Sequence, residues 1–190
     1  MAERSGWLKG TWSILVRPTP RTFRELAWGR QGVFGSAVAW LAGISGLVFL
    51  VLGISGYWEG FWLGQLVLGT VLVPLWLLLF VYLQHYLAAR LFRASRDQYE
   101  GLLLSSSLIL GLTMILNLLA YLLSLPFWLS SPLVWIYGAG LVVLSLMGVD
   151  GLSWWQAVLV ALFSGVLSLG GLILGALVLI SLLWTVPEFF

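Results

Sequence analysis

The chain has 190 residues, of which 61% are hydrophobic and only 8% charged, and its mean hydropathy is +1.05. Soluble domains are about 45–50% apolar and about 25% charged, so this composition excludes a soluble globular protein. The sequence contains no cysteine, which excludes disulfides, thiolate metal sites and thiol catalysis. The net charge is +2, and all nine basic residues lie in two stretches, Arg4 to Arg30 and Arg90 to Arg96. Both stretches flank apolar runs, which indicates anionic lipid headgroups rather than nucleic acid as their partner.

Residues 1–32 form the first element in chain order. Trp12 and Phe23 alternate there with basic residues such as Lys9 and Arg24. This mixture predicts one or two short amphipathic helices that lie in the membrane interface. An anchoring segment that directs insertion and a docking surface for a soluble partner are the two alternatives for this region.

Five apolar runs follow this segment. A helix needs about 20 residues to cross a hydrocarbon core of about 30 Å, and the runs have about this length or more. The sequence therefore predicts an all-α integral membrane protein with five transmembrane helices. The runs cover residues 33–56, 61–89, 101–123, 133–149 and 154–186.

Two of these runs have irregular features. Pro74 removes one backbone hydrogen bond from the second run, so a kink is expected there. The last run would be about 50 Å long as a straight helix, which exceeds the bilayer. A bend at Gly170-Gly171 or an interfacial piece is therefore expected.

The basic residues predict the orientation. A cytoplasmic N-terminus places both basic stretches in the cytoplasm, as the positive-inside rule requires. The segments 57–60 and 124–132 and the C-terminus, which contain no Lys or Arg, then face outward. The protein is expected in the plasma (inner) membrane if it is prokaryotic.

The sequence contains few groups for chemistry. All acidic residues after the first span lie at predicted span ends, where they cannot relay a proton across the membrane. The single histidine, His85, has no metal-binding motif around it. The serine run 105–107 has no histidine or lysine expected at its depth, so the hydroxyls are expected to bond to backbone carbonyls or to pack helices. We therefore expect no enzyme activity, no cofactor and no metal.

Small residues recur at four-residue spacing, which lets helix backbones approach closely within one chain or between two copies. Gln65, Asn117 and Gln156 are expected to form hydrogen bonds between helices. The candidate helix-packing residues are Ala42, Gly46, Ser107, Gly111, Ala161, Gly165, Gly171 and Gly175.

Three segments resemble a known family. The stretch 12–26, in which Pro18 precedes Thr22-Phe23, is followed by a first span. A basic loop in 91–104 leads through Tyr99 into the third span, and the turn 148–153 precedes Gln156-Ala157 at the start of the last. This order is similar to the YIP (Ypt/Rab-interacting protein) domain family, especially its prokaryotic branch.

The resemblance implies a five-span membrane protein without catalysis. Eukaryotic members act in early secretory traffic and bind Rab GTPases and one another. The Asp-Leu-Tyr-Gly-Pro-like motif of those members is missing here, so Rab binding is not expected of this chain.

Our leading hypothesis is a membrane-organising or partner-binding protein whose docking face is formed by residues 1–32 and 90–100. The alternative is a small transporter or channel component, with Gln65, Pro74 and Asn117 along a polar path. Expected partners are membrane lipids and either a second copy or another membrane protein. The candidate partner- or lipid-facing residues are Arg17, Pro18, Pro20, Arg21, Phe23, Arg24, Arg90, Arg93, Arg96 and Tyr99.

Overall fold

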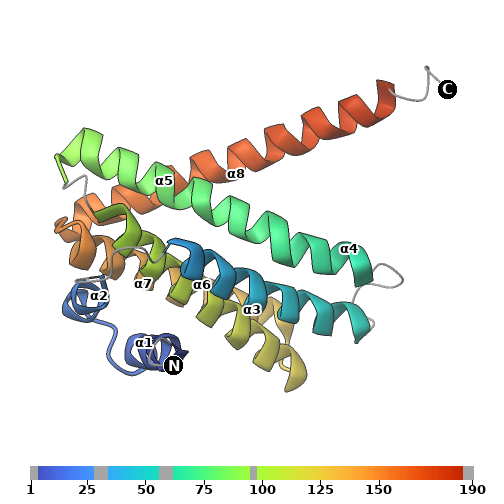
Figure 1. Ribbon diagram of the computed structural model, residues 1–190, viewed down its shortest axis with the longest axis horizontal. Coiled ribbons are helices and arrows are strands. Elements are labelled where there is room, and N and C mark those ends of the chain that lie inside the picture. Colours follow the sequence, from blue (N-terminus) through green and yellow to red (C-terminus); the bar gives the residue numbers. More distant parts are fainter. Residues whose placement is uncertain (1–3, 28–33, 56–61, 95–97, 186–190) are drawn as a thin grey trace.

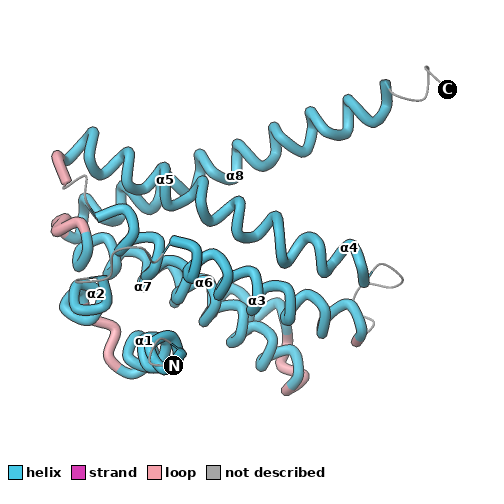
Figure 2. Tube along the Cα trace, in the orientation of Figure 1, coloured by secondary structure: helices cyan, strands magenta, loops and turns pink. Residues whose placement is uncertain are grey.

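The computed structural model describes residues 4–27, 34–55, 62–94 and 98–185, and the regular structure in these ranges is entirely helical (Figures 1 and 2). The helices are α1 (Arg4–Val16), α2 (Pro20–Ala27), α3 (Phe34–Ile54), α4 (Trp62–Val67), the π-helical turn η1 (Leu68–Leu72), α5 (Val73–Phe92), α6 (Tyr99–Leu122), α7 (Phe127–Val149) and α8 (Trp154–Thr185).

Five helical stretches in the described ranges are long and apolar enough to cross a membrane. They are α3, the continuous unit from α4 to α5, α6, α7 and α8. In four of them no more than 33% of the residues are buried inside the protein, so large apolar side chains face outward. Exposed apolar surface of this extent is typical of helices that face lipid. The prediction of an all-α protein is confirmed for the described residues, and so is the prediction of five helices long and apolar enough to span a membrane.

Helix α6 is the centre of the bundle. It packs mainly against α3 and α7, and also against α5, α2 and α1 (Figure 1). Residues 101–113 of α6 are all buried, whereas the residues after them are half-buried or exposed except for the buried Ala120. The buried half lies toward the end of the bundle that carries α2, so the core is thickest at that end.

Two helices differ from the expected spans. Helix α7 begins at Phe127, six residues before the expected fourth span, and includes Pro132. Proline at this position removes only the hydrogen bond to the carbonyl of Trp128, which lies in the first turn of the helix. Helix α8 is continuous through Gly170 and Gly171 and ends at Thr185. In Figure 1 its last turns diverge from the bundle.

The second span accommodates Pro74 with a π-helical turn immediately before it. The N–H of Val73 donates to the carbonyl of Leu68, five residues back, instead of to Gly69. In this wider register the carbonyl of Gly69 would accept from residue 74, which is a proline without an N–H. The turn therefore leaves the Gly69 carbonyl without a donor from its own helix.

Ser45 of α3 satisfies this carbonyl. Its Oγ lies 2.5 Å from the oxygen of Gly69 and 2.6 Å from that of Leu41. The helices can approach so closely because a Cβ on Gly69 would lie 2.7 Å from the Ser45 carbonyl oxygen. A Cβ on Gly46 would likewise lie 2.5 Å from the Thr70 methyl group. Proline, π-turn, serine and glycines thus form one structural unit.

This unit gives a first prediction. Ser45→Ala leaves a buried carbonyl without a donor, so we expect a loss of about 1–2 kcal/mol in unfolding stability. Pro74→Ala restores an N–H in α5, so the same serine replacement should cost less in that background. The native chain, the two single variants and the double variant form a double-mutant cycle. Reversible unfolding of each protein in mixed micelles measures the four stabilities. Equal costs in both backgrounds would refute the coupling between Pro74 and Ser45.

Candidate functional site

Helix α2 is held in a groove between α6 and α7. Phe23 is fully buried there and belongs to the core of the bundle. The groove exists because it is lined by two glycines. A Cβ on Gly101 would lie 2.7 Å from the Cβ of Ala27, and a Cβ on Gly148 would overlap the carbonyl oxygen of Pro20. Phe23 therefore anchors α2 and does not belong to the partner-facing surface where the sequence placed it.

The other side of α2 is charged and exposed. Arg21 Nε donates to Glu25 Oε1 at 2.8 Å, with the two side chains 88% and 65% exposed. Arg24 is also exposed, and its Nε donates to the carbonyl of Gly148 at 3.2 Å. This carbonyl is in the last turn of α7, where helix carbonyls lack intrahelical donors and a cation is favourable. Arg24 therefore caps α7 and fixes α2 to it.

The structure brings described parts of both basic stretches to one end of the bundle, which we call the basic end. It consists of the α1–α2 connection, α2, the C-terminus of α5, the start of α6 and the turn 150–153 (Figure 1). Arg17, Arg90 and Arg93 are exposed there. Pro18 and Pro20, on either side of Thr19, are half-buried in the α1–α2 connection. Arg96 lies outside the described residues.

Aromatic side chains of neighbouring helices pack against each other at the basic end. Tyr99, the first residue of α6, packs edge-on against His85 of α5, with ring centroids 5.7 Å apart. Phe92 of α5 packs edge-on against Trp155 of α8 at 5.6 Å. Tyr99 is thus half-buried in the bundle, and the end of α5 that carries Arg90 is fixed to both neighbouring helices.

Asp150 is a buried acid at the basic end. It follows the last residue of α7, and neither of its carboxyl oxygens has a hydrogen-bond partner among the described residues. Burial raises the pKa of Asp150 from its ordinary value of 3.8 to about 7. Its position at a helix C-terminus, where the helix dipole is negative, also disfavours the charged form. The carboxyl group is therefore poised between its neutral and charged forms near neutral pH.

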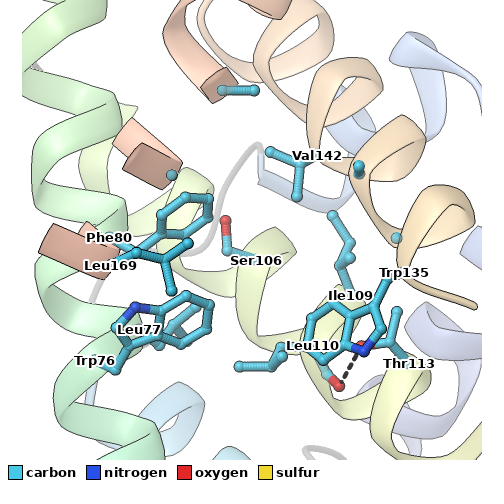
Figure 3. Close-up of a pocket in the computed structure, with 14 residues that line it drawn as sticks. Trp76, Leu77, Phe80, Ser106, Ile109, Leu110, Thr113, Trp135, Val142 and Leu169 are labelled. Carbon is cyan, nitrogen blue, oxygen red and sulfur yellow. Dashed lines mark hydrogen bonds between the residues drawn. The ribbon is translucent and has the colours of Figure 1, made fainter. Parts of the chain in front are cut away.

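A cavity of about 510 Å³ lies within the membrane-spanning part of the bundle (Figure 3). It is formed by α5, α6, α7 and α8. Small residues of α7 and α8 face large aromatic residues of α5 across it, which leaves the space unfilled. The lining residues are Trp76, Leu77, Phe80, Ser106, Ile109, Leu110, Thr113, Trp135, Gly138, Ala139, Val142, Ala161, Gly165 and Leu169.

The residues of the expected polar path do not line this cavity. Gln65 and Pro74 are buried in the second span. Asn117 Nδ2 donates to the carbonyl of Thr113 in its own helix, at 3.1 Å. Gln156 also bonds locally, because its Oε1 accepts from the N–H of Ser153 and caps the start of α8. Two serines form side-chain bonds between spans instead, namely Ser45 with Gly69 and Ser105 with Ser145 at 2.6 Å.

The candidate helix-packing residues have different surroundings. Gly46 faces the π-turn closely, and a Cβ on Gly111 would lie 3.4 Å from Trp40 Nε1. Ser107 is buried and Ala42 half-buried. A Cβ on Gly171 would lie 3.6 Å from Leu79, whereas Gly165 and Gly175 have nothing within 4 Å of a Cβ. Ala161 and Gly165 line the cavity.

The fold and the site define a helical protein with five stretches able to span a membrane, a charged helix docked at one end and an apolar cavity at membrane depth. In the described part of the chain, no cluster of His, Cys, Asp and Glu could hold a metal ion. No protein-family model, curated protein or solved structure matches the chain.

Proposed function

We propose that this chain is a non-enzymatic integral membrane protein of the YIP-like class, which binds a partner or organises the membrane through its basic end. The observation that carries the proposal is the geometry of α2. Phe23 and two glycines hold this helix in a fixed position, while Arg21 and Glu25 remain exposed. A flexible tail would lose conformational entropy on binding, whereas a docked helix presents its charges in a preformed arrangement.

The electrostatics favour an acidic partner surface. Arg17, Arg21, Arg90 and Arg93 are exposed at the same end of the bundle. Guanidinium groups bind carboxylates and phosphates through paired hydrogen bonds. Under the positive-inside rule this end faces the cytoplasm, where each basic residue near the anionic leaflet contributes about 1 kcal/mol. Anionic lipids and an acidic protein segment are both compatible with this surface.

The chemistry of the buried hydroxyls supports a role without catalysis. A serine nucleophile needs an adjacent base. Ser105 lies instead against Ser145 and the carbonyls of Gly101 and Leu102, and Ser107 donates to Leu104. Hydrogen bonds of this kind pack helices in membranes.

Site-specific photo-crosslinking in native membranes tests the proposal. A photoreactive residue replaces Glu25 on the exposed side of α2, and a second protein carries it at Ser55, which is exposed at the other end of α3. We expect a discrete protein or lipid adduct from position 25 and not from position 55.

Charge variants make this test specific. Replacing Arg17, Arg21, Arg90 and Arg93 together by Gln should reduce the adduct at least about fivefold, because four charge-assisted contacts are lost. Replacement of the same four by Lys keeps the charge and should retain most of the adduct. Arg24 is left unchanged because it caps α7. Identical adducts from the Gln variant, or none from position 25 in the native chain, would contradict the proposal.

A further inference from the structure

Two residues that line the cavity of α5, α6, α7 and α8 have a buried polar atom without a hydrogen-bond partner in the described structure: Nε1 of Trp76 and the hydroxyl of Ser106. The Ser106 side chain is only 3% exposed, lines the cavity and has no hydrogen-bond partner. Figure 3 shows its oxygen between Phe80 on one side and Val142 on the other. A buried hydroxyl without a partner is unfavourable by about 1–3 kcal/mol, so such groups are rare without a ligand or water to satisfy them.

The neighbouring serines show that a hydroxyl at this level of α6 can donate to a backbone carbonyl of its own helix. Ser105 and Ser107, in the same turn of α6, donate to carbonyls three or four residues back, as serines in apolar helices normally do. Thr113, the other hydroxyl residue of the cavity, donates to Leu110 in the same way. Among these four, only the hydroxyl of Ser106 has no hydrogen-bond partner, and its oxygen lies buried at the wall of the cavity.

The lining and the size of the cavity restrict its occupant. A volume of about 510 Å³ falls within the range of about 300–1,000 Å³ found for small-molecule sites. Apart from Ser106 and the bonded Thr113, the cavity is lined by aliphatic and aromatic residues and glycine. An occupant that fits this lining has a largely apolar body and a hydrogen-bond acceptor for the Ser106 hydroxyl or the Trp76 N–H.

The depth of Ser106 in the membrane can be compared with that of the exposed tyrosines of α5. Helices α5 and α6 are antiparallel, and the contact between His85 and Tyr99 sets Ser106 level with about Leu78. Exposed Tyr82 lies four residues nearer to the basic end, which is about 6 Å along the helix. Exposed tyrosine rings lie at the membrane interface, so a glycerolipid must be seated about 6 Å below the level of Tyr82 for its ester to reach Ser106.

We infer that the cavity binds one acyl chain of a membrane glycerolipid, with the ester carbonyl accepting a hydrogen bond from Ser106 Oγ. The chain extends from Ser106 between Trp76 and Trp135 toward the middle of the membrane. The small residues Ala161 and Gly165 of α8 provide the space for it. None of the residues that line this cavity belongs to the basic end. A test of lipid binding here therefore does not depend on the proposed function.

Native mass spectrometry tests the inference on the full chain. The protein is reconstituted into vesicles of palmitoyl-oleoyl phosphatidylglycerol, extracted in mild detergent and stripped of loosely bound lipid. One glycerolipid per chain should remain. Gly165→Leu places a large side chain at the cavity, where nothing lies within 4 Å of a Cβ, and should abolish retention. Gly43→Leu, at an equally open but exposed glycine of α3, is the matched control and should retain the lipid.

A second pair of variants tests the hydrogen bond. Ser106→Ala should lower the retained fraction about three- to tenfold, whereas Ser107→Ala, whose hydroxyl is bonded within α6, should not. This pair decides the question if Gly165→Leu fails to fold. Unchanged retention in Ser106→Ala, equal loss in both members of either pair, a retained isoprenoid or free fatty acid, or a chain dimer in place of the lipid would overturn the inference.

Discussion

Replacing Gly148 by Ala should release α2 from the bundle. The new methyl group would overlap the carbonyl oxygen of Pro20 and lie 3.0 Å from the Cβ of Phe23. The first of these contacts is with backbone, so the strain cannot be relieved by a side-chain rotation, and overpacking of this kind costs about 1–3 kcal/mol. The hydrogen bond from Arg24 to Gly148 should be lost with it.

Trypsin detects the release of α2, because cleavage after Arg21 or Arg24 requires that the helix open locally. In detergent micelles we expect cleavage there to accelerate about 10- to 100-fold in Gly148→Ala. Gly140→Ala is the matched control, since it makes the same change two turns earlier in α7, where a Cβ meets nothing within 4 Å. Equal cleavage rates in the two variants would show that the glycine groove does not hold α2.

The second large effect is on the pH dependence of stability. Burial raises the pKa of Asp150 to about 7 in the folded protein, against 3.8 in the unfolded chain. Below about pH 3 the group is protonated in both states and has no unfavourable effect. As pH rises toward 7 the unfolded chain loses its proton first, so the folded state becomes relatively less stable. The full effect is reached above about pH 7.

We therefore expect unfolding stability to fall by about 2–3 kcal/mol between about pH 5 and about pH 8. Asp150→Asn removes the titrating group and should flatten this part of the profile, with higher stability than the native chain at about pH 8. Glu25→Gln removes an exposed carboxylate and should leave the fall unchanged. His85→Asn is measured beside them, because histidine titrates in the same range. If the stability of Asp150→Asn still falls over this pH range, another titrating group causes the fall.

Hydropathy was sufficient to predict the five spans. Run length and the absence of charge depend only on local sequence, and each expected span overlaps a helix of the structure. The bounds were less predictable at prolines. Pro132 reads as a helix breaker in sequence, yet it lies within α7, because a lost hydrogen bond in the first turns of a helix is inexpensive.

The site depended on tertiary contacts that the sequence does not contain. Phe23 in an amphipathic segment suits a membrane surface and a core equally well, and only the glycines at 101 and 148, distant in sequence, make room for it in the core. The three consecutive serines 105–107 are equivalent in sequence. The cavity forms because small residues of α7 and α8 face α5. The sequence does not show that Ser106 lines this cavity without a hydrogen-bond partner.

We propose that the basic end of this five-span bundle faces the cytoplasm. Because the sequence contains no cysteine, single cysteines can be placed at Glu25, Ser55, Arg90 and Trp128, which are all exposed, and labelled with a membrane-impermeant maleimide. Positions 55 and 128 should be labelled in intact cells, and positions 25 and 90 only after the membrane is opened. Labelling of positions 25 or 90 in intact cells would contradict the orientation, and with it the cytoplasmic docking face.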